Sequence, residues 1–364
     1  MRLMFLVFLC LSLGSLIYVL WHVWQVLPWA SVWRWAAVCL CAACFLSMFY
    51  VLRGGLDELP LDVASAVYQI ATSSLIVLLY LALIFICADL LRLVHVLPAG
   101  LLRSNGATAL GIFIGLTLLL VWGNVKHHHK VRVPLSLTTE KPLAKDYKIV
   151  MMSDLHLGYH HRRGEFAKWV DLVNAERPDF ILIAGDIIDN SVRPLLADGM
   201  AEEFRRLRAP VYACLGNHEY YSRVPKARAF YEEAGIHLLV DTCAVVDSTL
   251  CIIGRDDRTN AARRSLAELK DKAPEGLYTF VLDHQPYHLD GAERLGIDFQ
   301  LSGHTHRGQV WPISWLTDRM YECAFGPWHR GATRYYVSSG IGIWGGKFRI
   351  GTQSEYIVAT LSQK

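Results

Sequence analysis

Charged side chains are scarce in the first third of this sequence. Of its 36 Lys and Arg and 33 Asp and Glu residues, only nine fall within residues 1–125 and the other 60 lie in residues 126–364. This imbalance excludes a water-soluble domain for the front third, whereas the remainder has an ordinary globular composition. The net charge of +3 is too small to indicate nucleic acid as the main partner.

A regular disulfide framework is also lacking. The sequence has nine cysteines, an odd number with no regular spacing. Five of them lie in apolar runs, namely Cys10, Cys39, Cys41, Cys44 and Cys87. This pattern favours free thiols in a reducing compartment over a secreted disulfide scaffold.

Long apolar runs are what the front third has instead. They cover residues 3–27, 35–52, 64–88 and 107–123. Each is close to the roughly 20 residues that a helix needs to cross a bilayer, and tryptophans gather at the first turn between runs, as in an interfacial belt. Four runs in succession argue against a cleaved signal peptide. Residues 1–125 are therefore predicted to form an all-α, four-helix transmembrane anchor.

The distribution of basic residues predicts the orientation of this anchor. Four spans would place both ends of the anchor on one side of the membrane. That side would carry Arg2, Arg53, Lys126, Lys130 and Arg132, against Arg34, Arg92 and Arg103 on the other. The excess predicts that the C-terminal domain lies on the cytoplasmic side. No acidic or basic side chain is embedded mid-span, which disfavours an ion or proton pathway.

Three adjacent histidines, His127, His128 and His129, follow the last apolar run. Such a run can bind metal, but histidines next to a membrane are commonly solvated or near lipid head groups. Residues 126–145 are polar and are broken by Pro134 and Pro142, which predicts a linker.

From residue 146 onward, short apolar runs alternate with amphipathic stretches. Strands are predicted at residues 147–152, 179–184, 210–215, 250–254, 278–282, 299–302, 335–338 and 355–361, and helices at residues 165–176, 197–207 and 226–234. The first half indicates βαβ units and the second half is richer in strands. Residues 146–364 are therefore predicted to form a layered α/β domain whose strand ends carry the functional loops.

Five of these strands are followed at once by Asp, His or Asn. The motifs are Asp154-Leu-His156, Gly185-Asp186-Ile-Ile-Asp189, Gly216-Asn217-His218-Glu219, Asp283-His284 and Gly303-His304-Thr-His306. In the first and last motifs the partners stand two apart, so an extended backbone would point them to the same side. Mixed nitrogen and oxygen donors suit Mn, Fe or Zn better than calcium, and a structural zinc site would use thiolates. Asp283 is either a hydrogen-bond partner of a ligand imidazole or a plain strand-end carboxylate.

In this order the motifs resemble those of the calcineurin-like metallophosphoesterase superfamily. Residues 336–342, residues 348–351 and Glu355 are similar to the bacterial membrane-associated branch typified by YkuE- and YaeI-like phosphoesterases. The resemblance covers residues 148–361 and does not extend to the four spans. It implies a layered β-sandwich flanked by helices, and a protein of the bacterial inner membrane.

The resemblance also implies two divalent metal ions and a role for each motif. One ion would be held by Asp154, His156, Asp186 and His306, and the other by Asp186, Asn217, His284 and His304. Asp186 would bridge the two ions, and a hydroxide between them would attack phosphorus in line. His218 matches the histidine that contacts the scissile phosphate and assists the leaving group. Protein Ser/Thr phosphatases of this superfamily carry Arg-Gly after the second motif, whereas Asn190-Ser191 follows here, which disfavours that branch.

No motif specifies the substrate. An apolar, aromatic insertion at residues 310–328 is either packing beneath a loop or a flap that touches the membrane or an acyl chain. Together with the anchor it favours a phosphomonoester, phosphodiester or pyrophosphate bond of a lipid-linked substrate. Arg162, Arg163 and Arg307 are the candidates for binding phosphate. The alternative is a non-catalytic membrane sensor of a phosphorylated ligand, which would tolerate missing metal ligands, yet all seven are present.

Overall fold

The computed structural model describes residues 2–98 and 100–364, and among these the side chains of residues 2–9 are left out. The side chain of Arg2, which entered the count of basic residues, therefore lies outside the described residues. The chain forms two compact units: Met1–Gly123 with Gly345–Lys347, and Asn124–Trp344 with Phe348–Lys364. Each unit is described by itself.

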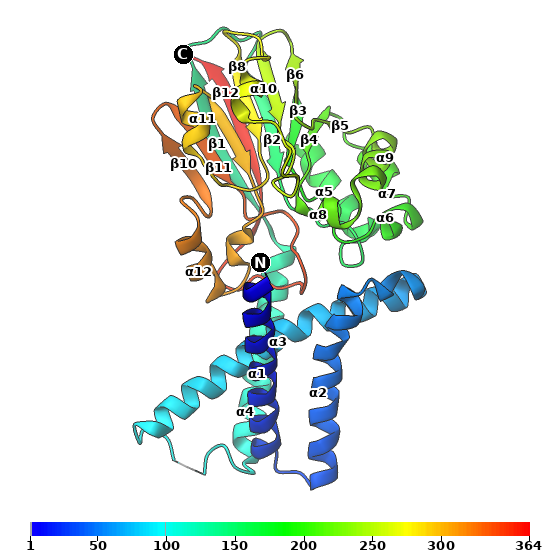
Figure 1. Cartoon of the computed structure of the whole chain (residues 1–364), viewed down its shortest axis with the longest axis vertical. Coiled ribbons are helices and arrows are strands. Elements are labelled where there is room, and N and C mark those ends of the chain that lie inside the picture. Colours follow the sequence, from blue (N-terminus) through cyan, green and yellow to red (C-terminus); the bar gives the residue numbers. More distant parts are fainter. Residues whose placement is uncertain (1, 99) are drawn as a thin grey trace. The chain divides into compact units, whose positions relative to one another are not determined.

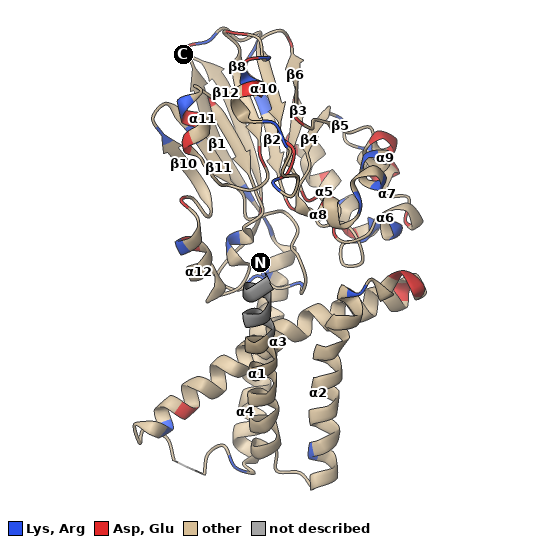
Figure 2. Ribbon diagram, viewed as in Figure 1, with Lys and Arg blue, Asp and Glu red and all other residues tan. Residues whose placement is uncertain are grey.

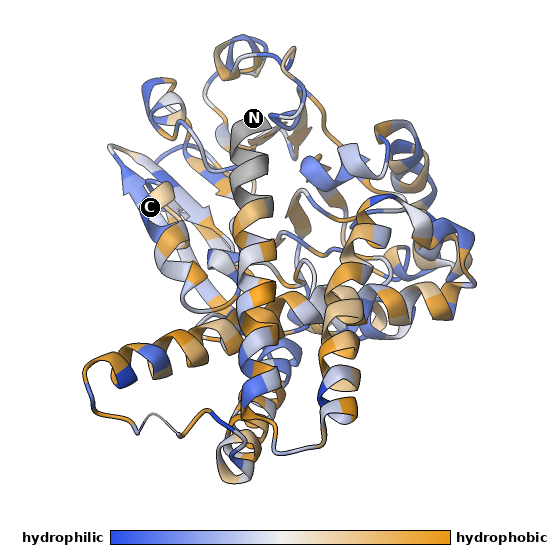
Figure 3. Cartoon of the chain, turned by 60° about the horizontal axis from the view of Figure 1, so that its bottom comes forward, coloured by the Kyte–Doolittle hydropathy of each residue, from blue (hydrophilic) through white to orange (hydrophobic). Residues whose placement is uncertain are grey.

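The first unit is helical. Its helices are α1 (Arg2–Val26), α2 (Ser31–Leu52), the short 3₁₀ helix η1 (Gly55–Glu58), α3 (Leu61–Leu93) and α4 (Gly106–His128), whose end belongs to the second unit. Among the described residues, α2, α3 and α4 are long and apolar enough to cross a membrane, and the described part of α1, Cys10–Val26, is apolar but shorter. Figure 2 shows few charged residues along these helices, and the colours of Figure 3 show that hydrophobic residues predominate in them. Three of the four expected spans thus correspond to helices that are long and apolar enough to cross a membrane, and the first remains a prediction.

Helix α3 continues beyond residue 88, where the apolar run was expected to end, so Asp89 lies inside an apolar helix. Its Oδ2 accepts a hydrogen bond of 2.9 Å from the Tyr18 hydroxyl and lies 2.9 Å from Nε2 of His22. His22 is buried and stacks on Phe85, with 4.6 Å between ring centroids. The sequence predicted no acidic or basic side chain in the middle of a span, and Asp89 lies near the end of its helix. Asp89 lies one turn from the helix end, where partners on α1 offset the cost of placing a carboxylate there.

The second unit contains two six-stranded sheets (Figure 1). The first has the order β1-β12-β2-β3-β4-β5 and the second has the order β10-β11-β9-β8-β7-β6. The strands are β1 (Lys130–Thr139), β2 (Tyr147–Met152), β3 (Phe180–Ala184), β4 (Val211–Cys214), β5 (His237–Leu238), β6 (Thr242–Val246), β7 (Leu250–Gly254), β8 (Tyr278–Leu282), β9 (Phe299–Ser302), β10 (Gly326–Arg330), β11 (Thr333–Val337) and β12 (Ser354–Gln363). The helices are α5 (Arg163–Glu176), α6 (Arg193–Ala197), α7 (Met200–Phe204), α8 (Asn217–Tyr221), α9 (Val224–Ala234), α10 (Leu266–Lys270), α11 (Asp290–Arg294), η2 (His306–Gly308) and α12 (Ile313–Met320).

The two sheets pack face to face with helices outside them. Along β2, Ile149 and Met151 belong to the core shared with the second sheet, whereas Val150 and Met152 belong to the core beneath the helices. This alternation follows from the two-residue period of a strand. The helical core includes residues of α5, α7 and α9, and a third core joins the second sheet to α10 and α11. The predicted layered α/β sandwich is therefore confirmed.

The linker predicted over residues 126–145 is wrong for most of its length, and only its last part, residues 140–145, follows β1 without helix or strand. Residues 126–128 continue α4, and Lys130–Thr139 form β1, which pairs in parallel with β12 over its whole length. Pro134 is compatible with this strand because β1 lies at the edge of its sheet, where a missing N–H can face solvent. The alternation of apolar and polar residues from Val131 to Leu137 was the overlooked signal of a strand with one buried face.

Shortening Leu137 to alanine tests whether β1 belongs to the folded core. Leu137 is 1 % exposed and packs in the core between the sheets. Leu137→Ala is expected to cost about 2–5 kcal/mol, because it leaves a cavity in a packed interior. The measurement is thermal unfolding of the full chain in detergent, with Thr138→Ala, an exposed neighbour, as the control. Equal melting temperatures for both variants would contradict the assignment.

The helix predicted at residues 197–207 has other bounds: the short helix α6 ends at Ala197 and α7 covers only Met200–Phe204. Gly199 lies between them with a φ of 63°, in the left-handed region that ends helices. The other two predicted helices appear as α5 and α9, each beginning two residues earlier than expected.

Candidate metal centre

Five loops bring the seven predicted ligand residues together. Strands β2, β3 and β4 run parallel in the first sheet, and β8 and β9 run parallel in the second, so the loops leave from matching strand ends. The seven residues are Asp154 and His156 after β2, Asp186 after β3, Asn217 at the start of α8 after β4, His284 after β8, and His304 and His306 after β9. All are buried except His304, which is partly exposed. The structure thus gathers every residue of the predicted set.

Asp154, His156 and His306 form the first donor group. Nε2 of His156 lies 3.0 Å from Nε2 of His306. Oδ1 of Asp154 lies 3.4 Å from Nε2 of His306 and 3.8 Å from Nε2 of His156. Two atoms that bind one ion at about 2.1 Å stand roughly 3.0–3.5 Å apart. The spacing of the three donors therefore fits a transition-metal ion.

His284, Asp186, Asn217 and His304 form the second donor group. Nδ1 of His284 lies 2.8 Å from the carbonyl oxygen of Ala184 and donates to it. In the neutral ring Nε2 then carries a lone pair, which faces Oδ2 of Asp186 at 3.1 Å and Oδ1 of Asn217 at 3.2 Å. His304 adds Nδ1, 2.8 Å from the same Asn217 oxygen. Acceptor atoms that face one another at these distances repel unless a cation or a proton lies between them.

Asp186 is the residue that belongs to both groups. Its Oδ2 lies 3.1 Å from Nε2 of His284 in the second group and 3.7 Å from Nε2 of His156 in the first. Its Oδ1 accepts the backbone N–H of His218 at 2.9 Å, which fixes the carboxylate in place. This is the position that a bridging ligand between two neighbouring ions requires.

The backbone at the ligands is not extended, and the argument from extended spacing was wrong. Five of the seven residues have left-handed backbone angles, with φ values of 54° at Asp154, 46° at His156, 51° at Asp186, 71° at His304 and 46° at His306. Non-glycine residues rarely adopt this region, and such strain gathers at functional sites. The side chains converge because the chain turns sharply as it leaves each strand.

Two glycines allow this close packing. A Cβ at Gly216 would lie 2.1 Å from Oδ1 of Asp186, and one at Gly303 would lie 2.3 Å from Oδ2 of Asp154. Neither position could hold a side chain without displacing a carboxylate. The glycines that precede Asn217 and His304 are therefore part of the site.

His218, the predicted catalytic histidine, lies beside the first donor group. Its ring centroid is 4.5 Å from that of His156, and its Nδ1 is 3.1 Å from Oδ1 of Asp189. The same Asp189 oxygen lies 3.4 Å from Nδ1 of His156. Asp189 thus positions both rings. No role was predicted for Asp189, although it is the second carboxylate of the Gly-Asp-x-x-Asp motif, which was the available signal.

Comparison with known proteins gives this geometry a family. Residues 147–308 match the family model described as calcineurin-like phosphoesterase. An uncharacterized metallophosphoesterase of Campylobacter jejuni is 30% identical over 259 residues, which are 69% of each chain. The chain belongs to the calcineurin-like metallophosphoesterase family.

Further relatives are similar to this metallophosphoesterase. An uncharacterized metallophosphoesterase of Helicobacter pylori is 31% identical over 229 residues, which are 61% of each chain. A transmembrane protein with metallophosphoesterase domain from Danio rerio is 30% identical over 280 residues, which are 70% of this chain and 63% of that one. The apolar helices and these relatives together indicate a membrane protein. The YkuE- and YaeI-like branch remains a prediction.

The charges of this metallophosphoesterase centre shift the pKa values of its histidines in opposite directions. Burial lowers the pKa of His304 to about 4, with a further contribution from His284. For His156, burial also lowers the pKa, but hydrogen bonds to Asp154 and Asp189 outweigh it and raise the pKa to about 10. Without metal, His156 is therefore protonated at neutral pH.

Metal affinity is accordingly expected to rise with pH. An incoming ion must displace the proton that His156 holds below its pKa of about 10, so acid favours the proton and alkali favours the metal. For each displaced proton, the dissociation constant for Mn²⁺ should fall about tenfold per pH unit between pH 6 and pH 8. Chelator-competition titrations of the detergent-purified protein measure this slope. A dissociation constant independent of pH would contradict the expectation.

Glu219 connects two of the ligand loops, a role that the sequence analysis did not assign. The fully buried carboxylate accepts backbone N–H groups from Gly216 at 2.7 Å, Asp186 at 3.1 Å and Ile188 at 3.0 Å. The Tyr231 hydroxyl donates a fourth bond of 2.7 Å. Glu219 therefore holds the loops after β3 and β4 in register with each other.

Arg349 supports the loop that carries His306 and was also missed. Its side chain is 0 % exposed and donates to the carbonyl oxygens of His306 at 2.9 Å and Gly342 at 2.8 Å. Burial lowers its pKa to about 10, so the guanidinium stays charged at neutral pH. A lone arginine in the tail of residues 348–351 was the only available signal. Its interactions fix the backbone that carries His306.

The structure decides between the two interpretations of Asp283. Its carboxylate binds Arg255 at 2.6 Å and Arg263 at 3.0 Å. Nδ1 of the neighbouring His284 donates instead to the Ala184 carbonyl. Asp283 is therefore the partner of two arginines, not of a ligand imidazole.

Two of the three candidate phosphate-binding arginines are ion-paired. Arg162 binds Asp198 through two hydrogen bonds of 2.5 and 2.7 Å, and Arg163 binds Glu203 at 2.9 Å and Glu202 at 2.8 Å. Arg307 directly follows His306, and its guanidinium lies 4.8 Å from the centre of the Phe325 ring. Its position next to His306 therefore favours Arg307 over Arg162 and Arg163 as the arginine that binds phosphate.

Proposed function

We propose that this metallophosphoesterase hydrolyses a phosphoric ester or pyrophosphate bond with two divalent metal ions held at the centre described above. The observation that carries the proposal is the position of Asp186 Oδ2, at 3.1 Å from a donor of one group and 3.7 Å from a donor of the other. Imidazole, carboxylate and amide donors suit manganese, iron or zinc. Asp154, His156, Asp186 and His306 would hold one ion, and Asp186, Asn217, His284 and His304 the other.

Metal ions bound at such a site lower the pKa of a bound water and neutralise the oxygens of a transferring phosphoryl group. The side chains do the positioning. Glu219 and the backbone N–H of His218 fix the loop and the carboxylate of Asp186. Burial of the donors excludes bulk water and strengthens their electrostatic effect.

His218 is proposed as the acid that protonates the leaving oxygen. Its Nδ1 faces Asp189, which leaves Nε2 as the atom that can donate to a substrate. A positioned imidazole of this kind can serve as a general acid. Asp189 fixes the orientation of this ring, so the pair acts as one unit.

An assay with generic substrates tests the proposal. Full-length protein in detergent is stripped with chelator and then assayed with a chromogenic phosphodiester and the matching monoester. Hydrolysis should be absent from the stripped protein and restored by Mn²⁺. The ratio of the two rates assigns the protein as a phosphodiesterase or a monoesterase. No turnover of either ester with Mn²⁺, Fe²⁺ or Zn²⁺ would overturn the proposal in favour of a non-catalytic sensor.

We further propose that the substrate is lipid-linked, as in lipid metabolism at the cytoplasmic face of a bacterial inner membrane. Support comes from α12, which follows the ligand His306 closely in the chain. Its large apolar side chains are exposed, at 64% for Trp315, 60% for Leu316 and 60% for Met320. Exposed apolar patches of this kind mark contacts with membrane or acyl chains.

Helix α12 also borders the metal centre. The backbone of η2 contacts the start of α12 so closely that a Cβ at Gly308 would lie 2.6 Å from the backbone of Ile313. Beyond the helix, the Tyr321 ring has its centroid 6.4 Å from that of His304. An acyl chain on α12 would thus lie next to the site of hydrolysis, and Arg307 on η2 would be close enough to meet its phosphate.

Polar substitutions on α12 test the proposal of a lipid-linked substrate separately from the proposal of two-metal phosphoester hydrolysis. Trp315→Ser with Leu316→Ser is expected to lower turnover of a phosphorylated lipid in vesicles by about tenfold or more, since burying two large side chains contributes roughly 3–6 kcal/mol. Turnover of a soluble chromogenic ester should be unchanged. The control is Leu196→Ser, an equally exposed leucine on α6. A parallel loss on both substrates, or no loss on either, would contradict the lipid proposal.

A further inference from the structure

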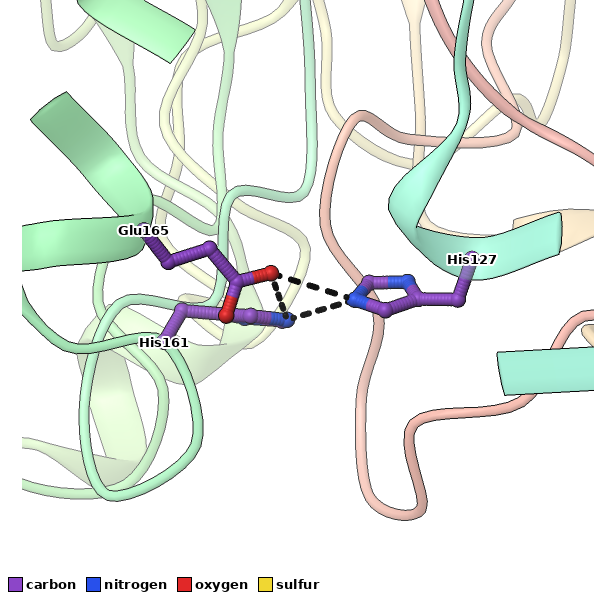
Figure 4. A group of neighbouring side chains, drawn as sticks. All are labelled: His127, His161 and Glu165. Atoms are coloured by element: carbon purple, nitrogen blue, oxygen red, sulfur yellow. Dashed lines mark hydrogen bonds and ion pairs between the residues drawn. The ribbon is translucent and has the colours of Figure 1, made fainter. Parts of the chain in front are cut away.

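Another group of side chains that could hold a metal ion lies in the second unit and shares no residue with the seven predicted ligands. His127 from the last turn of α4, His161 from the loop before α5 and Glu165 from α5 face one another (Figure 4). Both histidine side chains are 0 % exposed, and the glutamate side chain is 16% exposed. Of the three adjacent histidines at the end of α4, only His127 is buried. The other two are exposed and are not members of the group.

The hydrogen bonds around the two rings direct their lone pairs toward the carboxylate. Nδ1 of His161 lies 3.1 Å from the carbonyl oxygen of His156 and donates to it, so in the neutral ring Nε2 carries the lone pair. Nδ1 of His127 lies 3.4 Å from Oγ of Ser354, which can accept its proton. Both Nε2 atoms then face each other and the Glu165 carboxylate. Metal-binding histidines show the same arrangement, with the second nitrogen bonded to a carbonyl or hydroxyl group.

The distances between the three donor atoms fit one ion. The Nε2 atoms of His127 and His161 are 3.3 Å apart, and Oε1 of Glu165 lies 3.3 Å from the first and 3.9 Å from the second. Donors at about 2.0–2.2 Å from a tetrahedral ion stand roughly 3.3–3.6 Å apart. Closing the longest of the three distances needs only a small rotation of the partly exposed glutamate.

We propose that His127, His161 and Glu165 bind a third divalent ion of the zinc class, separate from the catalytic pair. Two imidazoles and one carboxylate are a donor set that zinc accepts, with water in the fourth position. The absence of thiolates and the single carboxylate disfavour copper(I) and calcium.

The third ion would stabilise the loop that carries a catalytic ligand. His161 donates to the backbone of His156, and the Gly158 N–H donates to the His161 carbonyl at 3.1 Å. His127 stands 34 residues before His161 in the chain, so the ion would join the end of α4 to this loop. The third site would thus be a structural metal site, and its ion would not contact the substrate.

Metal counting tests the third site without reference to activity. Full-length protein in detergent is stripped, reloaded with Zn²⁺, passed through a desalting column and analysed for zinc per chain. Glu165→Gln, which keeps the shape of the side chain, and His127→Gln should each retain one zinc fewer than wild type. His129→Gln, the exposed histidine two residues away, should match wild type. Equal zinc in all four chains would overturn the proposal.

A titration of the wild-type chain with Co²⁺ keeps the test independent of how the variants fold. A further equivalent of Co²⁺ with the strong visible absorption of a four-coordinate ion is expected, and a titration without such bands would overturn the proposal. The outcome is separable from the proposed function. If Asp186→Asn loses zinc while Glu165→Gln does not, only the catalytic pair exists. If Glu165→Gln loses zinc while Asp186→Asn does not, the result supports the third site and contradicts the catalytic pair.

Discussion

Replacing Asp186 by asparagine is expected to lower kcat/KM for a chromogenic phosphoester by about 10³-fold or more. The amide keeps the size of the side chain but removes the charge that lies between the two donor groups, at 3.1 Å from His284 Nε2 and 3.7 Å from His156 Nε2. Removing a single preorganised electrostatic contact to a transition state already costs about 10²–10³-fold. A bridging carboxylate contributes to both ions, so its loss should cost at least as much.

Metal analysis accompanies this kinetic measurement. Asp186→Asn should also lose at least one catalytic ion per chain, and excess Mn²⁺ should restore little activity. Asp271→Asn, on an exposed loop, provides the control and should keep both metal and activity. A variant at Asp186 with wild-type turnover would show that the carboxylate bridges nothing.

His218→Gln is expected to separate chemistry from metal binding. The ring is 4.5 Å from the His156 ring and is held by Asp189, but it is not one of the seven ligand residues. The variant should therefore keep its metal and lose about 10²–10⁴-fold in kcat, the usual contribution of a general acid. His237→Gln, at an exposed position, should behave as wild type.

The leaving group decides the role of His218. A nitrophenolate leaves without help from an acid, so the loss of kcat should be several-fold smaller for a nitrophenyl ester than for an alkyl ester. If the loss is equal for both leaving groups, His218 stabilises the phosphate instead of protonating the leaving oxygen. If metal is lost together with activity, its role is structural.

Eight of the twelve strands in the described residues were predicted from the sequence because they form local apolar runs, whereas β1, β5, β6 and β10 were missed. The apolar runs that became β2, β7, β8 and β9 have the expected bounds, since buried strands between two layers are continuous and apolar. The ligand residues were identifiable because each directly follows such a strand. The structure places all seven within one cluster of loops.

The backbone geometry and the supporting residues depend on contacts distant in the chain. The left-handed angles at Asp186 and His306 arise only when five loops pack together, so a spacing argument based on extended chain could not find them. Glu219 and Arg349 look unremarkable in sequence because their partners are backbone atoms of other loops. Strand β1 was missed because Pro134 suggested a linker, and only its pairing with β12 explains that proline.

Electron paramagnetic resonance of the Mn²⁺-loaded protein tests most directly whether two ions are bound next to each other. Two ions that share Asp186 must couple magnetically, so the protein loaded with two or more equivalents is expected to give the broad, multi-line spectrum of a coupled pair. Asp186→Asn should give only the signal of isolated Mn²⁺. A wild-type spectrum of isolated ions alone, at full loading, would contradict the dinuclear centre and the mechanism that depends on it.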